Sequence, residues 1–100
     1  MVTLEQLFRS YKQQIENIEE PDELGSEVLM LLTSRDLFER FELTAEQQQQ
    51  LDRLDAELVK RWEILAEVLP FPTRRERRRW WWFLHEGPQV REQARALAAD

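Results

Sequence analysis

Apolar residues recur at steps of three and four along nearly the whole chain of 100 residues. This spacing places them on one face of an α-helix, whereas a half-buried strand needs apolar and polar residues in alternation. No segment shows sustained alternation, and no Asn-Gly or Asp-Gly turn joins two candidate strands. The pattern therefore predicts an all-α fold, a small antiparallel helical bundle of four main helices plus a short C-terminal helix.

The first helix has a clear start and a clear stop. Thr3 and Gln6 have the spacing of a capping box, in which each side chain binds the other residue's backbone N–H. Pro21 excludes helical geometry from the residue before it, so we expect the helix to end near Glu19 or Glu20.

The second helix is predicted to run from Asp22 to about Thr33, with Pro21 at its start. Its apolar residues cover more than one face, which is typical of a central helix buried against several neighbours. Residues 33–36 leave two interpretations open. Either Asp36 and Glu39 cap a fresh turn there, or the helix continues without interruption.

The third helix is predicted from Ala45 to about Leu69, after a second capping box formed by Thr44 and Gln47. Its stripe repeats in coiled-coil fashion and consists of Leu51, Leu54, Leu58, Trp62, Leu65 and Leu69.

Proline and glycine delimit the last two helices. The Pro-Phe-Pro sequence at 70–72 ends the third helix, and Thr73 with Glu76 has the spacing of a cap for the fourth. Gly87 and Pro88 close that helix, and a last helix is predicted from Gln89 to about Ala99. Val90, Ala94, Leu97 and Ala98 lie on one side of it.

The length of the chain suits one small domain, residues 1–100, with one hydrophobic core. The core is expected to draw on residues from the first three helices. They are Leu7, Phe8, Tyr11, Ile15, Val28, Leu31, Leu32, Leu54, Leu58, Trp62 and Leu65.

Charge is divided unevenly along the chain. The formal net charge is −6. Residues 1–58 carry 14 acidic and 5 basic side chains, whereas residues 59–100 carry 9 basic and 6 acidic ones. The positive excess lies in residues 73–86, where five arginines face two glutamates. The acidic and basic parts of the chain are therefore able to attract each other.

The most unusual segment follows these arginines with a block of aromatic residues. Five consecutive large apolar residues, 80–84, go fully round an α-helix, so we expect some of them to be exposed or to meet a partner. The arginines would also occupy the first turns of the helix, where the helix dipole disfavours cations. The candidate contact residues are Arg74, Arg75, Arg77, Arg78, Arg79, Trp80, Trp81, Trp82 and Phe83.

One interpretation of this segment is intramolecular. The arginines would pair with the acidic corner Glu19, Glu20, Asp22 and Glu23. Arg77 and Arg78 would stack on Trp81 and Trp82.

The other interpretation is a protein interface, because Trp and Arg are enriched at binding hot spots. The partner would be a second copy, giving a homodimer, or another protein for which the chain acts as adaptor. Nucleic-acid or membrane-surface binding through Arg74–Arg79 and Trp80–Trp82 is the alternative, but the net charge of −6 opposes binding to a polyanion.

Catalytic chemistry has few candidate groups. The chain has no cysteine and one histidine, His85, for which we expect a capping or packing role. Trp81 and Trp82 stand where a helical metal site would need a carboxylate, and no phosphate loop or activated nucleophile is recognisable. We expect no enzyme activity, cofactor or metal, and interpret the carboxylates as helix surface or caps. Without a basic, apolar leader the chain is expected to be cytoplasmic.

Overall fold

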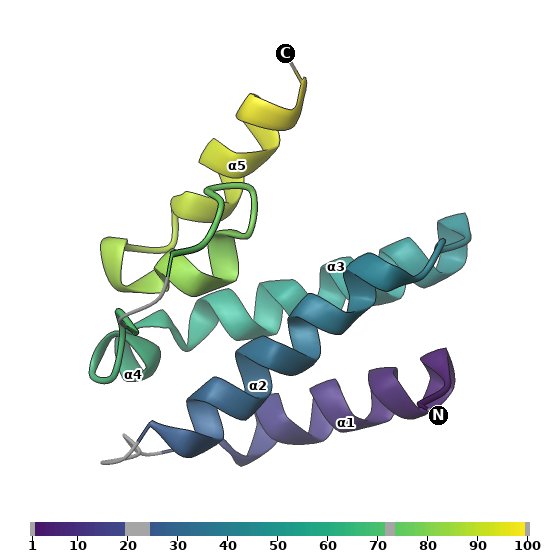
Figure 1. The fold of residues 1–100 in the computed structure, drawn as a ribbon, viewed down its shortest axis with the longest axis horizontal. Coiled ribbons are helices and arrows are strands. Elements are labelled where there is room, and N and C mark those ends of the chain that lie inside the picture. Colours follow the sequence, from purple (N-terminus) through teal and green to yellow (C-terminus); the bar gives the residue numbers. More distant parts are fainter. Residues whose placement is uncertain (1, 20–24, 72–73, 100) are drawn as a thin grey trace.

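The computed structural model describes residues 2–19, 25–71 and 74–99, and within these ranges every regular element is a helix. Three α-helices, each antiparallel to the next along the chain, form the body of the molecule (Figure 1). The predicted all-α helical bundle is confirmed. The elements in chain order are α1 (Leu4–Asn17), α2 (Ser26–Leu37), η1 (Phe38–Arg40), α3 (Ala45–Lys60), α4 (Trp62–Ala66), η2 (Trp80–Glu86) and α5 (Val90–Ala99).

Both predicted capping boxes are present. The Thr3 hydroxyl accepts the Gln6 backbone N–H at 3.1 Å, and the Gln6 side chain accepts the Thr3 N–H at 3.0 Å. Thr44 and Gln47 make the equivalent pair before α3. Each box satisfies two N–H groups that a helix start otherwise leaves unpaired.

Helix α2 begins at Ser26 and ends later than predicted. Gly25 has φ of +71°, a left-handed conformation in which the chain cannot be α-helical, and the helix starts at Ser26. It then continues through residues 33–36 to Leu37 and passes into η1. The interpretation in which the helix continues without interruption through residues 33–36 is therefore confirmed. The proposed capping pair Asp36 and Glu39 is wrong, and the predicted start at Asp22 lies outside the described residues.

The predicted third helix is interrupted at Arg61, which separates α3 from α4. The Arg61 guanidinium donates to the Glu57 carbonyl at 2.9 Å, and so satisfies a backbone acceptor at the end of α3 with its own side chain. The apolar stripe nevertheless continues across the break, because Leu58 and Leu65 are both fully buried.

The predicted fourth helix is wrong in both its start and its type. Residues 74–79 form no helix, and the helical segment begins only at Trp80 as the 3₁₀ helix η2, with a kink at Phe83. Thr73 lies outside the described residues. The predicted end of this helix at Gly87 is confirmed, since η2 ends at Glu86 and Gly87 has φ of +117°. Helix α5 follows after Pro88.

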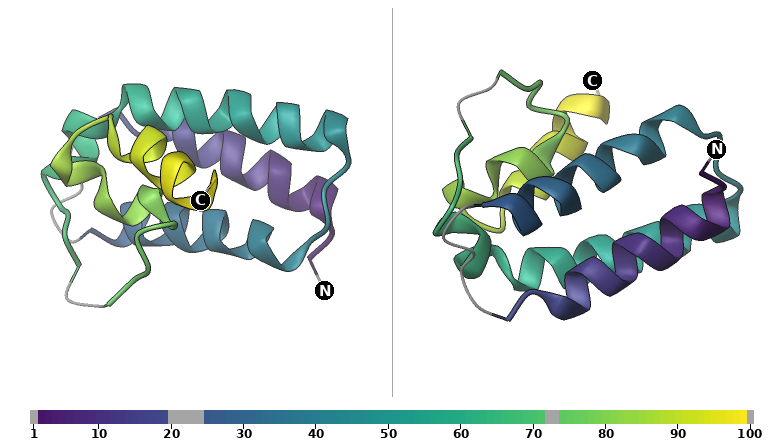
Figure 2. Two further views of the ribbon diagram at one scale, coloured as in Figure 1. Left: turned by 90° about the horizontal axis from the view of Figure 1, so that it is seen from above. Right: turned by 60° about the horizontal axis from the view of Figure 1, so that its bottom comes forward.

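The core sits where α1, α2 and α3 meet the aromatic segment. Helix α1 contacts both α2 and α3, while η2 contacts α2, α4 and α5. Figure 2 shows η2 and α5 against one side of the bundle, between α2 and α3. The predicted core residues are buried, except that Leu54 and Trp62 are half-buried. Helix α2 is less enclosed than expected, because Leu29 and Met30 are exposed.

Candidate functional site

The three consecutive tryptophans belong to the core. Trp80, Trp81 and Trp82 are between 1% and 5% exposed, and Leu84 is fully buried. The expectation that part of the run must be exposed is therefore wrong for the tryptophans, and holds in part only for the half-buried Phe83. The physical reason is that η2 is enclosed by three helices, so side chains that point in different directions all meet protein.

Asp36 accepts hydrogen bonds from two of these rings. Its Oδ1 atom lies 2.8 Å from the Trp81 Nε1 atom and 2.9 Å from the Trp82 Nε1 atom. The Arg79 guanidinium approaches the same oxygen at 3.1 Å. Asp36 thus supplies the hydrogen-bond acceptor that each buried indole N–H group needs. It also neutralises Arg79.

A second aspartate joins the three long helices. Asp55 of α3 accepts the Tyr11 hydroxyl of α1 at 2.7 Å, and the Arg35 guanidinium of α2 donates to both carboxylate oxygens at 2.9 and 3.1 Å. Asp55 and Arg35 are both buried, and the guanidinium lies 4.1 Å from the centre of the Trp81 ring. This cluster connects α1, α2, α3 and η2 through directional contacts.

Burial and the Asp55 charge shift the pKa values of Tyr11 and Arg35. Burial raises the pKa of Tyr11 well above its ordinary value, and the neighbouring carboxylate adds to this effect. Burial alone would lower the pKa of Arg35, but the charge and hydrogen bonds of Asp55 outweigh it and raise that pKa. The folded cluster therefore holds a neutral phenol beside a guanidinium–carboxylate pair.

Tyr11 is the chain's single tyrosine, so its ionisation can be read directly from the absorbance near 295 nm. Because its pKa is raised on folding, its contribution to stability is present below about pH 10 and falls as the pH rises above the unfolded value. We expect tyrosinate absorbance to appear only together with loss of helical circular dichroism. Tyr11→Phe supplies the background, and a reversible titration near pH 10 in the folded protein would contradict the cluster.

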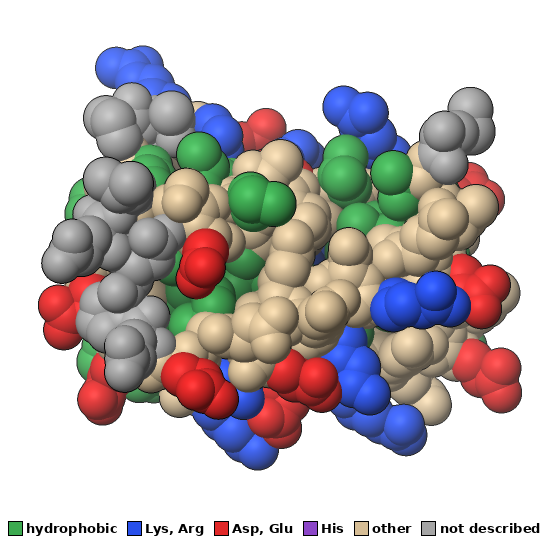
Figure 3. Space-filling view, turned by 90° about the horizontal axis from the view of Figure 1, so that it is seen from below, with side chains coloured by type: hydrophobic (Ala, Val, Ile, Leu, Met, Phe, Trp, Pro, Cys, Tyr) green, Lys and Arg blue, Asp and Glu red, His purple; other side chains and the backbone are tan. Residues whose placement is uncertain are grey.

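Three of the five arginines of residues 74–79 form ion pairs within the chain, whereas Arg74 and Arg75 form none with a carboxylate of the described residues. Arg77 binds Glu86 at 2.7 Å, and Arg78 binds Glu76 at 2.6 Å and Glu39 at 3.5 Å. Together with the contact between Arg79 and Asp36, four carboxylates face this segment. Figure 3 likewise shows acidic and basic side chains side by side along the edges of one face.

The predicted partners of these arginines were different. Of the acidic corner, Glu20, Asp22 and Glu23 lie outside the described residues, and Glu19 makes no ion pair with a described residue. The stacking pairs also differ. Arg75 lies 4.4 Å from the centre of the Trp82 ring, and Arg77 lies 4.4 Å from that of Phe83.

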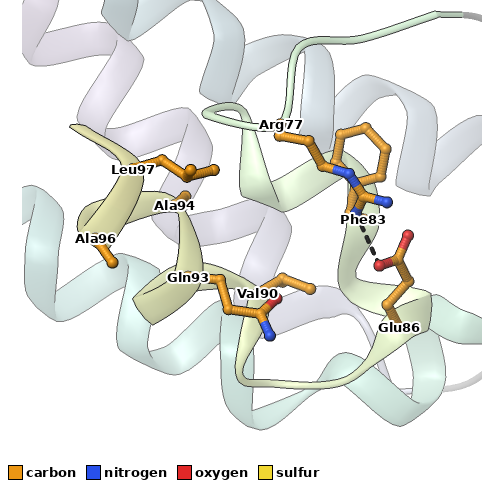
Figure 4. Close-up of a pocket in the computed structure, with 8 residues that line it drawn as sticks. All are labelled: Arg77, Phe83, Glu86, Val90, Gln93, Ala94, Ala96 and Leu97. Carbon is orange, nitrogen blue, oxygen red and sulfur yellow. Dashed lines mark hydrogen bonds and ion pairs between the residues drawn. The ribbon is translucent and has the colours of Figure 1, made fainter. Parts of the chain in front are cut away.

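A cavity of about 480 Å³, which we call the α5 groove, lies between α5 and the arginine-rich residues 74–79. Figure 4 shows Ala94 and Leu97 pointing from α5 toward the segment that carries Arg77 and Phe83. The Leu97 side chain is 61% exposed, although it continues the stripe whose earlier members pack in the core. The groove is lined by Arg77, Phe83, Glu86, Val90, Gln93, Ala94, Ala96 and Leu97.

Arg77 and Phe83 are the predicted contact residues that the structure brings to the groove, whereas the three tryptophans lie behind it in the core. Asp55 was wrongly assigned to the surface, and Asp36, predicted as a helix cap, instead accepts hydrogen bonds from Trp81 and Trp82. A sequence signal for Asp55 was available, since it stands four residues after Leu51 and three before Leu58, on the buried face of α3.

His85 is partly buried in the last turn of η2. Its Nδ1 atom is buried and has no hydrogen-bond partner among the described residues, while Nε2 lies 3.8 Å from Glu86. Within residues 2–19, 25–71 and 74–99 no group of three or more His, Asp or Glu side chains has the geometry to hold a metal ion. No helix in those ranges is long and apolar enough to cross a membrane.

Comparisons of the chain with protein-family models, with curated proteins and with solved structures gave no significant match.

Proposed function

We propose that this protein is a non-enzymatic protein-interaction module and that its contact surface is the α5 groove. The observation that carries the proposal is the exposure of Leu97 at the edge of a cavity lined by Phe83, Val90 and Ala94. A large apolar side chain beside an apolar cavity is typical of a surface that another molecule covers. The buried tryptophans behind Phe83 support this surface without touching the partner.

The groove suits a protein better than a nucleic acid. A polyanion needs unpaired cations, but three of the five arginines of residues 74–79 already pair with carboxylates, and Arg75 lies against the Trp82 ring. The groove instead combines apolar side chains with one arginine at its rim, a composition common in protein interfaces. The tryptophans themselves do not support a dimer interface, because their rings are buried within one chain.

The proposal can be tested with a display library of helical peptides that carry apolar residues at i, i+3 or i+4, and i+7, selected against the immobilised protein. We expect the selected peptides to lose about tenfold or more in affinity for Leu97→Asp, which places a carboxylate in the apolar groove.

The matched control is Val2→Asp, because Val2 is 53% exposed and lies outside the groove. This change should leave the affinity within about twofold of the wild type. A library that yields only peptides indifferent to Leu97→Asp would contradict the proposal.

A further inference from the structure

We infer that the occupant of the α5 groove is a helix of another protein whose apolar face is flanked by acidic side chains. This inference rests on the proposed function and adds the chemistry of the partner. Charge complementarity carries it, because the groove lies beside the positive part of an otherwise acidic chain. Residues 59–100 carry 9 basic and 6 acidic side chains, whereas residues 1–58 carry 5 basic and 14 acidic ones.

Two arginines of the segment that borders the groove keep a charge that no carboxylate neutralises. Arg74 and Arg75 form no ion pair with a carboxylate of the described residues. Arg74 is exposed, while the Arg75 guanidinium lies 4.4 Å from the centre of the Trp82 ring and donates to the Arg74 carbonyl at 3.1 Å. Neither contact supplies a negative charge, so a carboxylate of a partner can still bind here.

Arg77 lines the groove and has hydrogen-bond donors to spare. Its Nη1 atom donates to Glu86 at 2.7 Å, whereas its Nε and Nη2 atoms donate to no described residue, and its side chain is 58% exposed. A guanidinium carries five N–H donors in a fixed fork, so it can bind a second carboxylate beside the first. The Arg77 guanidinium also lies 4.4 Å from the centre of the Phe83 ring. A partner carboxylate on Arg77 would therefore stand directly beside the apolar part of the groove.

The apolar and the basic side chains occupy opposite sides of the groove. Figure 4 shows Leu97 and Ala94 on the α5 side and Arg77 across from them. Arg74 is three residues from Arg77, at most about 10 Å along the chain, which is about two turns of a bound helix. One helix can therefore place apolar residues at i, i+3 or i+4, and i+7 against Leu97 while acidic residues on its flank reach the arginines.

The charge of the remaining surface also favours an acidic partner at this place. The acidic residues 1–58 repel an acidic helix, while the arginines beside the groove attract it, and this difference orients the encounter. A nucleic acid is less well suited. Its binding depends on several phosphate contacts, whereas this segment offers two arginines without a carboxylate.

A helical display library whose polar positions are divided equally among Glu, Lys and Gln tests the inference. Peptides that bind the wild type and lose affinity for Leu97→Asp should carry an excess of Glu over Lys. Groove-binding peptides without this excess would overturn the acidic partner and leave the interaction module supported. A library that yields no peptide sensitive to Leu97→Asp would overturn both.

Arg74→Glu gives a second readout, with one selected acidic peptide and a copy of it that has Lys in place of each Glu. The variant should bind the acidic peptide about threefold or more weakly at about 50 mM NaCl, and the Lys peptide correspondingly more tightly. Both differences should nearly disappear at about 1 M NaCl, where the screening length is about 3 Å. The loss should lie in the association rate, as is typical of rim charges, whereas Leu97→Asp should mainly raise the dissociation rate.

Arg9→Glu is the matched control, because it changes the net charge by the same amount on α1. The Arg9 side chain is 75% exposed and lies outside the groove. This variant should bind the acidic peptide within about twofold of the wild type. Equal losses for Arg74→Glu and Arg9→Glu would show that overall charge alone governs binding. That result, or an Arg74→Glu variant that binds both peptides like the wild type, would overturn the inference.

Discussion

Asp55→Ala is expected to lower the free energy of unfolding by about 3–5 kcal/mol, a large part of the stability of a domain of this size. The substitution leaves the Arg35 guanidinium buried without its bidentate partner and removes the acceptor of the Tyr11 hydroxyl. A buried charge without a partner is costly because neither water nor protein solvates it. Three helices and η2 meet at this cluster, so we expect the whole cooperative transition to shift.

Urea unfolding followed by circular dichroism measures this loss. The control is Asp52→Ala on the same helix, because Asp52 is partly exposed and makes long ion pairs with Arg91 and Arg95 and an exposed hydrogen bond with Gln48. It should cost less than about 1 kcal/mol. If Asp55→Ala does not fold, the double variant Arg35→Met, Asp55→Leu should restore folding, because it removes both charges together. Equal losses at Asp52 and Asp55 would show that the buried cluster does not stabilise the fold.

The helical bundle was predictable from the sequence because local signals determine it. The steps of three and four from Leu4 to Ile15, and the capping residues Thr3 and Thr44, act within a few residues of each other. The starts of α1 and α3 therefore appear where the pattern places them, whereas α1 ends at Asn17, earlier than predicted. The start of α2 at Ser26 was not predicted, because it depends on the left-handed conformation of Gly25.

The aromatic segment was not predictable in the same way. Its apolar run is buried on several sides because α2, α4 and α5 surround η2, and such enclosure is a tertiary property that no local period reveals. The arginines before it form no helix, so the expected conflict with the helix dipole does not arise. Their partners Asp36 and Glu39 stand far away in the sequence.

The candidate site was predicted in part. Phe83 and Arg77 were among the candidate contact residues, and the stripe through Val90, Ala94 and Leu97 was recognisable from its spacing. The groove itself could not be predicted, because it depends on the angle at which α5 leaves the bundle after Gly87.

Trp81→Ala is expected to lower the free energy of unfolding by about 3–5 kcal/mol, as is usual when a large aromatic side chain is removed from a core. The Trp81 ring is 1% exposed, donates to Asp36 and lies under the Arg35 guanidinium. Its removal therefore leaves a cavity and also exposes the buried ion pair to water. Trp81→Phe keeps an apolar ring but loses the hydrogen bond, and should cost about 1–3 kcal/mol.

The most direct test of the account compares the stability of Trp81→Ala and Trp62→Ala, because Trp81 is fully enclosed in the core and Trp62 is only half-buried. If the tryptophan run is core and the groove is the contact surface, Trp81→Ala should lose clearly more unfolding free energy than Trp62→Ala in urea titrations. The account would be contradicted if Trp81→Ala kept the stability of the wild type, or lost no more unfolding free energy than Trp62→Ala.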